Sequence, residues 1–378
     1  MGGKEPITYT STGVDYKAMN PFKRYAQQRG QETDKNLLRL GMRVVGASRG
    51  ESAFVWEDGD RYLALTIEGL GTKNLVAEKM RVARAMQGTN DRTFFDNIAQ
   101  CTAAMVLNDN ITVGADPMVI NQYLATGSGK WFKDEQATKD FTDGWIRACN
   151  LAGVVSGGGE SATLIDIIYP ETADFAGAAV GIVRPKERLM VGGQKLVPGD
   201  SILLVESSGI HANGLTLGRT VATMLPDGYF TLLSNGQGYG EVLLTPTHIY
   251  VSLLRAYFEA GLDLHSAVNI TGHGWKKLMR ANRGDLSYII DTTPEPQPVF
   301  DFIQKHSRNT DRQMYGTFNM GAGFAVFMPA ADVEKAQRIT KDRFGWQSLN
   351  AGYVEEGSRQ VVIRPKQITY QAETLQIR

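Results

Sequence analysis

The chain has 378 residues, a length at which more than one domain is expected. Of these residues, 42% are hydrophobic and 21% are charged, which is an ordinary composition for a globular protein. Forty basic residues balance forty acidic ones, so the overall charge gives no reason to expect nucleic acid or an anionic membrane as a partner. Two cysteines and the lack of a signal-peptide-like or membrane-spanning apolar run favour a reduced, cytoplasmic protein.

The first half predicts a hairpin, two amphipathic helices and further strands. Residues 1–35 are polar and are expected to wrap or fray. The hairpin pairs 52–56 with 62–67 around Asp58-Gly59, and its second strand ends at Glu68. Apolar spacing predicts a helix over 93–107 that leads to Asn108-Asp109. We expect the remaining elements of this half to be a strand at 117–126, a helix at 135–152, a short strand at 153–155 and a strand at 175–183.

The second half begins near residue 184, where the sequence pattern changes. A turn predicted at 196–200 then precedes a predicted buried strand at 201–206. A loop at 207–214 leads to a helix that ends near 224. Strands and helices then alternate, with hairpin-like interruptions, which predicts a mixed α/β fold in two domains, 1–183 and 184–378. The expected elements are helices at 246–260, 299–306 and 331–344, strands at 286–291 and 323–328, and two final strands.

Three acidic residues stand in short signatures that suit a magnesium-bound nucleotide. Glu68 precedes a turn in which Gly69 and Gly71 leave the backbone open and Thr72 and Lys73 offer a hydroxyl and an ammonium. The spacing is neither a Walker A loop nor a dinucleotide fingerprint, and a simple turn is an equally good interpretation.

Asp109 and Glu160 are the other two acidic residues. Asn108-Asp109 fits a helix end at least as well as a ligand site, whereas three glycines before Glu160, with Gly158 and Gly159 next to it, indicate a backbone that something approaches closely. Because Mg²⁺ prefers carboxylate oxygens, Glu68, Asp109 and Glu160 together predict a Mg-nucleotide enzyme.

The loop histidine His211, which stands before Asn213-Gly214, can serve as an acid, a base or a phosphate donor, although a histidine without a role is commoner. The histidines and cysteines lack the spacing of a zinc site, and no serine-hydrolase elbow is present. The residues alone do not define the substrate.

Taken in order, these signatures resemble the phosphoribosylformylglycinamidine cyclo-ligase family, also called aminoimidazole ribonucleotide synthetase. The resemblance covers most of the chain. It is carried by Tyr9 with Gly13-Val14-Asp15, 69–73, 108–109, 114–117, 123–127, 158–160, 175–177, 198–200, 208–214, 244–251 and 315–321.

The resemblance implies a homodimer in which the N-terminal halves form a shared β-barrel and the C-terminal halves are ferredoxin-like. It also implies that ATP phosphorylates the formyl amide oxygen of formylglycinamidine ribonucleotide, after which the imidazole ring closes. Catalysis is assigned by resemblance to Lys73, His211 and Asn213, the metal to Glu68, Asp109 and Glu160, and the nucleotide to Gly69, Gly71, Thr72, Lys73, Asn108, Gly158 and Gly159.

The chain departs from the family at Glu68, where aspartate is usual, at His273, where a glycine is usual, and in a shorter loop at 44–50. Two other functions stay open: a Mg-ATP enzyme of the same fold that resembles thiamine monophosphate kinase, and a non-catalytic dimeric homologue.

Overall fold

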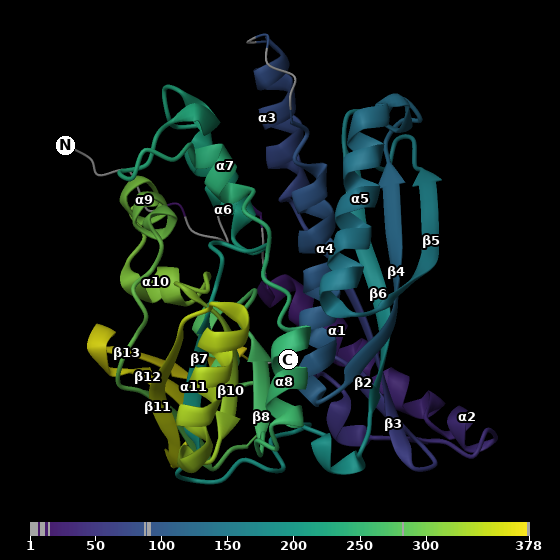
Figure 1. Cartoon of the computed structure of the whole chain (residues 1–378), viewed down its shortest axis with the longest axis vertical. Coiled ribbons are helices and arrows are strands. Elements are labelled where there is room, and N and C mark those ends of the chain that lie inside the picture. Colours follow the sequence, from purple (N-terminus) through teal and green to yellow (C-terminus); the bar gives the residue numbers. More distant parts are fainter. Residues whose placement is uncertain are drawn as a thin grey trace.

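The computed structural model describes residues 7, 12–13, 16–86, 88, 92–281 and 283–375, so Tyr9, Val14 and Asp15 of the opening signature lie outside the described residues. Two β-sheets with helices packed on them confirm the mixed α/β fold (Figure 1). The six-stranded sheet uses residues up to Val183, and the seven-stranded sheet begins at Ser201.

The six-stranded sheet has the order β1-β2-β3-β6-β4-β5. The hairpin of β2 and β3 forms where it was predicted, and β5 runs parallel to β4 at the edge. The strands are β1 (Arg43–Val44), β2 (Phe54–Asp58), β3 (Arg61–Gly69), β4 (Asp116–Thr126), β5 (Val155–Thr163) and β6 (Ala173–Val183).

One face of this sheet is covered by α4 (Phe95–Asn110) and α5 (Glu135–Ala152), which pack against each other. Helix α4 is almost wholly buried because it lies between the two sheets (Figure 1). The opposite face of the sheet exposes apolar side chains, among them Leu65 and Ile67 of β3. Further helices of this half are α1 (Tyr16–Gly30), α2 (Lys35–Leu38) and α3 (Asn74–Met86).

The seven-stranded sheet has the order β13-β12-β9-β11-β7-β10-β8. Within it, β11, β7, β10 and β8 are neighbours and pair antiparallel. The strands are β7 (Ser201–Glu206), β8 (Ser266–Asn269), β9 (Leu286–Ile290), β10 (Ala322–Met328), β11 (Ser348–Glu356), β12 (Gln360–Ile363) and β13 (Ile368–Gln371).

Helices α8 (Val251–Glu259) and α11 (Ala330–Phe344) contact each other, and α11 packs on β7 and β11 of this sheet. A group of shorter helices lies above the seven-stranded sheet in the view of Figure 1. It contains α6 (Leu215–Ala222), α7 (Tyr239–Leu243), α9 (Pro298–Ser307) and α10 (Asp311–Tyr315). A 3-10 helix, η8 (Gly274–Met279), follows β8.

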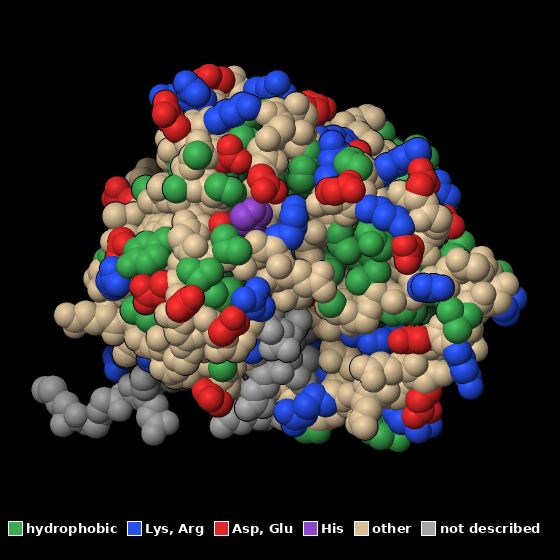
Figure 2. All heavy atoms as spheres, turned by 90° about the horizontal axis from the view of Figure 1, so that it is seen from below, with side chains coloured by type: hydrophobic (Ala, Val, Ile, Leu, Met, Phe, Trp, Pro, Cys, Tyr) green, Lys and Arg blue, Asp and Glu red, His purple; other side chains and the backbone are tan. Residues whose placement is uncertain are grey.

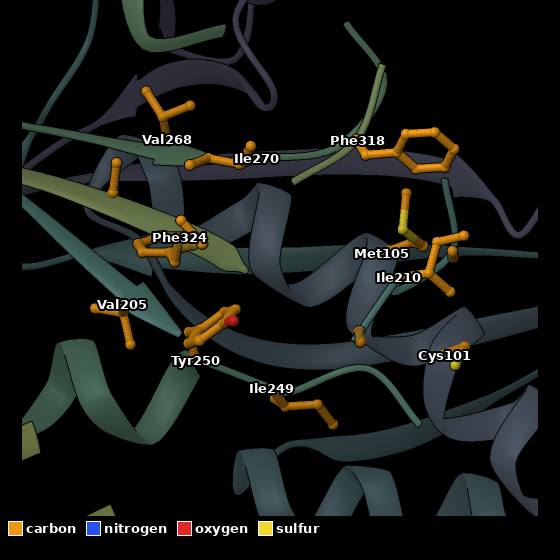
Figure 3. Close-up of a cluster of buried hydrophobic side chains, with 14 of the residues drawn as sticks. Cys101, Met105, Val205, Ile210, Ile249, Tyr250, Val268, Ile270, Phe318 and Phe324 are labelled. Carbon is orange, nitrogen blue, oxygen red and sulfur yellow. The ribbon is translucent and has the colours of Figure 1, made fainter. Parts of the chain in front are cut away.

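The two halves share one apolar core. Cys101 and Met105 of α4 belong to the same buried cluster as Ile210, Tyr250 and Phe318 of the C-terminal half. Figure 3 shows these side chains in the space between α4 and the strands of the second sheet. Because this layer buries apolar surface from both halves, α4 can hold its carboxyl end in a fixed place between them.

Four expectations from the sequence were wrong in detail. The segment from Pro246 to Tyr250 has no regular secondary structure, and helix α8 starts only at Val251, because side chains of α4 bind the backbone of 244–250. The glycine triplet lies inside β5 and does not follow a short strand. The early residues contain helix α1, and three strands end the chain where two were expected.

Candidate functional site

Glu68 lies near the carboxyl end of β3, on the face of the sheet that packs against α4. Its cross-strand partner is Gly177 of β6. A side chain on Gly177 would meet Val106 of α4 at 3.2 Å, and directly paired residues project from the same face. The sheet register therefore turns the Glu68 carboxylate toward the helix.

Asp109 lies in the last turn of α4, one helical turn after Met105. It is buried, and one carboxylate oxygen accepts a hydrogen bond of 2.7 Å from the amide of Asn269 at the end of β8. The Asn269 contact orients the carboxylate from the C-terminal half. The acidic side chain is thus fixed by an element of each half.

Glu68 and Asp109 line the same cavity, which has a volume of about 200 Å³. The walls come from α1, β3, α4, the loop before α6, the turn before η8 and the end of the chain. The lining residues are Lys23, Glu68, Met105, Asp109, Asn213, Thr271, Gly272, His273, Lys277, Arg280 and Leu375. Two of the three predicted metal carboxylates and the predicted Asn213 are therefore brought together.

The charges in this cavity influence one another. Burial raises the pKa of Glu68 to about 7, and the nearby Asp109 adds to the shift. Lys277, Arg280 and Lys23 oppose it. Burial also lowers the pKa of Lys277 to about 8, although Asp109 stabilises its charged form. Two acids facing three cations make a site suited to a ligand that carries both a cation and an anion.

His273 also lines the cavity and has a left-handed backbone, with φ at 74°. This conformation is costly for residues other than glycine, which explains physically why glycine would suit the position. Burial lowers the pKa of His273 to about 3, so the imidazole is neutral near pH 7. It contributes a polar ring and no charge.

Asn213 is presented by a turn that needs the glycine after it. Gly214 has φ at 75°, and a β-carbon there would lie 2.0 Å from the ring of Phe318. The motifs at 208–214 and 315–321 therefore pack on each other directly. This contact sets the position of Asn213 at the cavity wall.

His211 does not line the cavity. It is buried, and its Nε2 accepts a hydrogen bond from the backbone N–H of Ser208 at 3.2 Å. Burial, with the nearby His248 and Lys73, holds its pKa well below the usual range. The arrangement makes His211 a neutral residue that stabilises the 207–214 turn, and it does not reach the carboxylates in this conformation.

Lys73 is also fully buried. Its ammonium donates to the carbonyl oxygens of His211 at 2.8 Å and Thr245 at 2.6 Å. Thr72 contacts the hydroxyl of Thr216 at 3.3 Å. Neither residue lines the cavity of Glu68, so the predicted phosphate contacts of Gly69, Gly71, Thr72 and Lys73 are not formed by this wall.

Asn108 binds the protein itself. Its amide nitrogen donates to the carbonyl of His248 at 2.8 Å, and its amide oxygen accepts from the N–H of Tyr250 at 2.9 Å. Each polar end makes one bond to the 244–250 segment, so the position of the Asn108 amide is fixed by the protein. The residue holds the 244–250 segment against α4.

Glu160 lies apart from the other two carboxylates. The register aligns Glu68 with Gly177, Gly177 with Gln122, and Gln122 with Gly159, so three strand spacings of roughly 14 Å in total separate Glu68 from the edge strand. Glu160 is exposed on β5. The metal triad expected from the sequence is therefore not assembled within one chain.

The glycines before Glu160 have a local structural cause. A β-carbon on Gly157 would lie 2.3 Å from Asn121, and one on Gly159 would lie 2.2 Å from the carbonyl oxygen of Gln122. Gly158 has φ at 104°, beside a register shift between β4 and β5. The close approach expected at these glycines is found at Gly159, where the approaching group is the backbone of β4, whereas no atom lies within 4 Å of a β-carbon on Gly158.

Sequence reasoning missed four polar residues at this site. Lys277 and Arg280 lie in and after η8, Lys23 comes from α1, and Asn269 ends β8. No motif spacing marks them. The glycine-containing turn Thr271-Gly272-His273-Gly274, which comes just before Lys277, was the available sequence signal. The structure gives a reason for its last glycine, because a β-carbon on Gly274 would lie 2.2 Å from the carbonyl of Tyr315.

The donor set at the cavity fits magnesium. Mg²⁺ commonly binds one or two carboxylates and completes its coordination with water and substrate phosphate. Glu68 and Asp109 provide such a pair. In the part of the chain that the structure describes, no cluster of three or more His, Cys, Asp or Glu side chains could enclose a metal. The described helices also include none long and apolar enough to cross a membrane.

Comparison with known proteins gives two family matches. Residues 50–183 match the N-terminal domain of AIR synthase related proteins, and residues 197–364 match the C-terminal domain. Phosphoribosylformylglycinamidine cyclo-ligase of Methanocaldococcus jannaschii is 34% identical over 344 residues, which cover 88% of each chain. The enzyme of that name from Rippkaea orientalis is 32% identical and covers 94% of this chain and 99% of its own.

Solved structures share the fold at lower identity. A chain of the HypE-HypF complex superposes with a TM-score of 0.59 at 14% identity and covers 85% of this chain and 92% of its own. AaThiL complexed with AMPPCP and TMP superposes with a TM-score of 0.55 at 14% identity, with 85% and 90% covered. Through its identity to named relatives over most of its length, the chain belongs to the phosphoribosylformylglycinamidine cyclo-ligase family.

Proposed function

We propose that this chain is an ATP-dependent cyclo-ligase that converts formylglycinamidine ribonucleotide to aminoimidazole ribonucleotide in purine biosynthesis. The proposal rests on family membership over nearly the whole chain and, within the molecule, on one observation: Glu68, Asp109 and Asn213 meet at one cavity together with Lys277 and Arg280. That set of charges suits a magnesium-bound triphosphate beside a polar substrate.

The chemistry requires activation of an amide. The terminal phosphoryl group of ATP passes to the formyl amide oxygen and ADP leaves. The amidine nitrogen then attacks the activated carbon, the phosphate departs with the former amide oxygen, and the imidazole ring closes. Such transfers depend mainly on positioning and on cations near the phosphoryl oxygens. A fold neighbour solved with AMPPCP, AaThiL, supports ATP as the nucleotide.

The residues of the cavity are proposed to contact different parts of the ligands. Glu68 and Asp109 would hold Mg²⁺, which neutralises phosphate charge when it is bound. Lys277, Arg280 and Lys23 face the same space as cations. Asn213 offers an amide to the substrate, and His211 acts as a positioning residue because it holds the turn that presents Asn213.

A homodimer is part of the proposal. The face of the first sheet that α4 does not cover exposes Leu65, Ile67, Val119 and Val155, and Ile67 is 76% exposed. An apolar sheet face of this kind favours a partner. If a second copy covers it to form an intersubunit barrel, Glu160 of β5 comes to the other subunit's site, and this would complete the predicted metal set and the nucleotide contacts of Gly158 and Gly159.

The C-terminal half is proposed to be a ferredoxin-like domain. Support comes from the order β11-β7-β10-β8, with helices between β7 and β8 and between β10 and β11.

Figure 2 shows acidic and basic side chains interspersed over one face of the molecule, which fits the zero net charge. We place the enzyme in the cytoplasm, where a pathway supplied with ATP would operate.

ADP release in the presence of formylglycinamidine ribonucleotide, ATP and Mg²⁺ tests the proposal, with the amine product measured separately. We expect ADP and product in equal amounts, and a loss of both in Asp109→Asn. Thiamine monophosphate serves as the control substrate. ADP formed only with thiamine monophosphate would indicate a kinase of the same fold, and binding of both ligands without any ADP would indicate a non-catalytic homologue.

A further inference from the structure

Two adjacent lysines of η8 point in different directions. The Lys276 ammonium lies 5.4 Å from the centre of the Tyr370 ring, and Lys276 is not among the residues that line the cavity. Lys277 instead projects into the cavity, where it is 8% exposed and donates a hydrogen bond to the hydroxyl of Thr271. The buried Trp275, whose ring nitrogen donates to the carbonyl of Asn319 at 2.8 Å, fixes the direction of this turn.

The positive charge of the Lys277 ammonium is compensated by acidic groups that line the same cavity. Its hydrogen-bond partner Thr271 is neutral, whereas Asp109 and Glu68 both attract it. Arg280 also lines the cavity, but its guanidinium is shared with groups outside the cavity lining, since it lies 3.5 Å from Glu51 and donates to the carbonyl of Gly50 at 3.2 Å. A buried ammonium is costly without a compensating charge, so Lys277 and the two carboxylates depend on one another.

A divalent ion bound by the same carboxylates would meet this ammonium at short range. Within one small cavity the two cations repel each other, and an added phosphate relieves the repulsion because it attracts both. We propose that Lys277 is an internal counter-cation: it compensates Glu68 and Asp109 when no metal is bound, weakens metal binding without nucleotide, and binds phosphate oxygen once the metal-nucleotide enters. The last part of this inference rests on the proposed function.

The consequence is a pair of effects with opposite signs. Removal of the positive charge in Lys277→Met should tighten the binding of a divalent ion to the nucleotide-free protein by about 3- to 30-fold, because the repulsion is lost. The same change should weaken the binding of AMPPCP in the presence of Mg²⁺ by about 10-fold or more. A residue that only supports the fold would move both affinities in one direction.

Manganese binding, followed by the electron paramagnetic resonance of free Mn²⁺, tests the first effect on the full chain without nucleotide. Lys276→Met is the matched control, since it removes a charge one residue away and outside the cavity. Lys277→Arg keeps the charge and should behave like the natural protein, and circular dichroism reports whether each variant is folded. Asp109→Asn should remove the Mn²⁺ site in every background.

Unchanged or weaker Mn²⁺ binding by folded Lys277→Met would overturn the proposal. So would equal effects in Lys276→Met, or the absence of Mn²⁺ binding in both the natural protein and Lys277→Met. If Mn²⁺ binding tightens and AMPPCP binding is unchanged, the counter-cation role stands and the phosphate contact is wrong. ADP release with formylglycinamidine ribonucleotide is measured separately, so failure of the proposed function is distinguishable from failure of this inference.

Discussion

The buried ammonium of Lys73 lies 2.6 Å from the carbonyl oxygen of Thr245, and this hydrogen bond joins the turn after β3 to the segment that precedes α8 in the C-terminal half. A second bond reaches the carbonyl of His211 at 2.8 Å. Lys73→Met would leave both carbonyl oxygens without a donor. We expect a loss of about 2 kcal/mol in the free energy of unfolding, measured by urea denaturation.

The same variant separates two roles for Lys73. A phosphate ligand, as the sequence predicts, would raise the KM for ATP strongly and leave stability nearly unchanged. The hydrogen bonds to His211 and Thr245 lead to the reverse expectation. A stable Lys73→Met protein with impaired ATP binding would show that the loop rearranges around the nucleotide.

Gly214 provides a test of how the motifs pack together. Gly214→Ala places a β-carbon 2.0 Å from the Phe318 ring at a φ of 75°, so both strain and overlap oppose it. Gly236→Ala is the matched control, with φ at 79° and no atom within 4 Å. We expect a destabilisation of about 1 kcal/mol at Gly236 and about 3 kcal/mol or more at Gly214, measured by chemical denaturation. Equal losses would contradict the packing argument.

Elements whose limits are set locally were predictable from the sequence. Helix α5 spans Glu135–Ala152, as predicted, because Asp134 caps its first turn through a bond from the N–H of Ala137, and Gly153 ends it with φ at 62°. Helix α8 was predicted to start at Pro246 and starts at Val251. The backbone before it is bound by side chains of α4, a tertiary contact that no local pattern reveals.

The site divides in a similar way. Glu68 and Asp109 were recognisable because each ends an element with clear periodicity, and both reach the cavity. The distance to Glu160 depends on the strand order β3-β6-β4-β5, which the sequence does not specify. Lys277 carries no motif, and its direction depends on the packing of η8. The positions of Glu160 and Lys277 relative to the cavity depend on strand order and on packing, so they could be established only from the structure.

His248 makes the stability of the fold depend on pH. Burial lowers its pKa to about 4, whereas the unfolded chain has a value near 6.5. Between these values the unfolded state binds more protons, so stability is complete above about pH 6.5 and falls as the pH decreases toward 4. His248→Phe keeps a ring at the position that lies 4.5 Å from Trp346 and removes the titration.

Between pH 7 and pH 5, we expect His248→Phe to lose about 2 kcal/mol less unfolding free energy than the natural protein, measured by denaturation at both values. His306→Phe is the control, because His306 also contacts an aromatic ring, that of Phe302, but is less deeply buried. Its pH dependence should differ less from that of the natural protein. An identical acid loss in His248→Phe would show that this imidazole does not titrate between the two states.

The separation of Glu68 and Glu160 within one chain leads to a prediction for the dimer. If Glu160 serves the partner's site, Glu68→Gln and Glu160→Gln should each reduce kcat by about 100-fold or more when assayed alone. After the two inactive variants are mixed and exchange subunits, half of the dimers contain one of each. One of the two sites in such a dimer has both natural carboxylates, so about a quarter of the natural activity should return.

The recovery should depend on the exposed apolar face of the sheet. Adding Ile67→Asp to both variants places a charge on that face, so we expect light scattering to show monomers and the mixture to stay inactive. If Glu160 instead acts within its own chain, no mixed dimer contains an intact site and mixing restores nothing. Recovery without subunit exchange would exclude the shared site as its cause, so the time course of exchange, followed by native mass spectrometry, should match the return of activity.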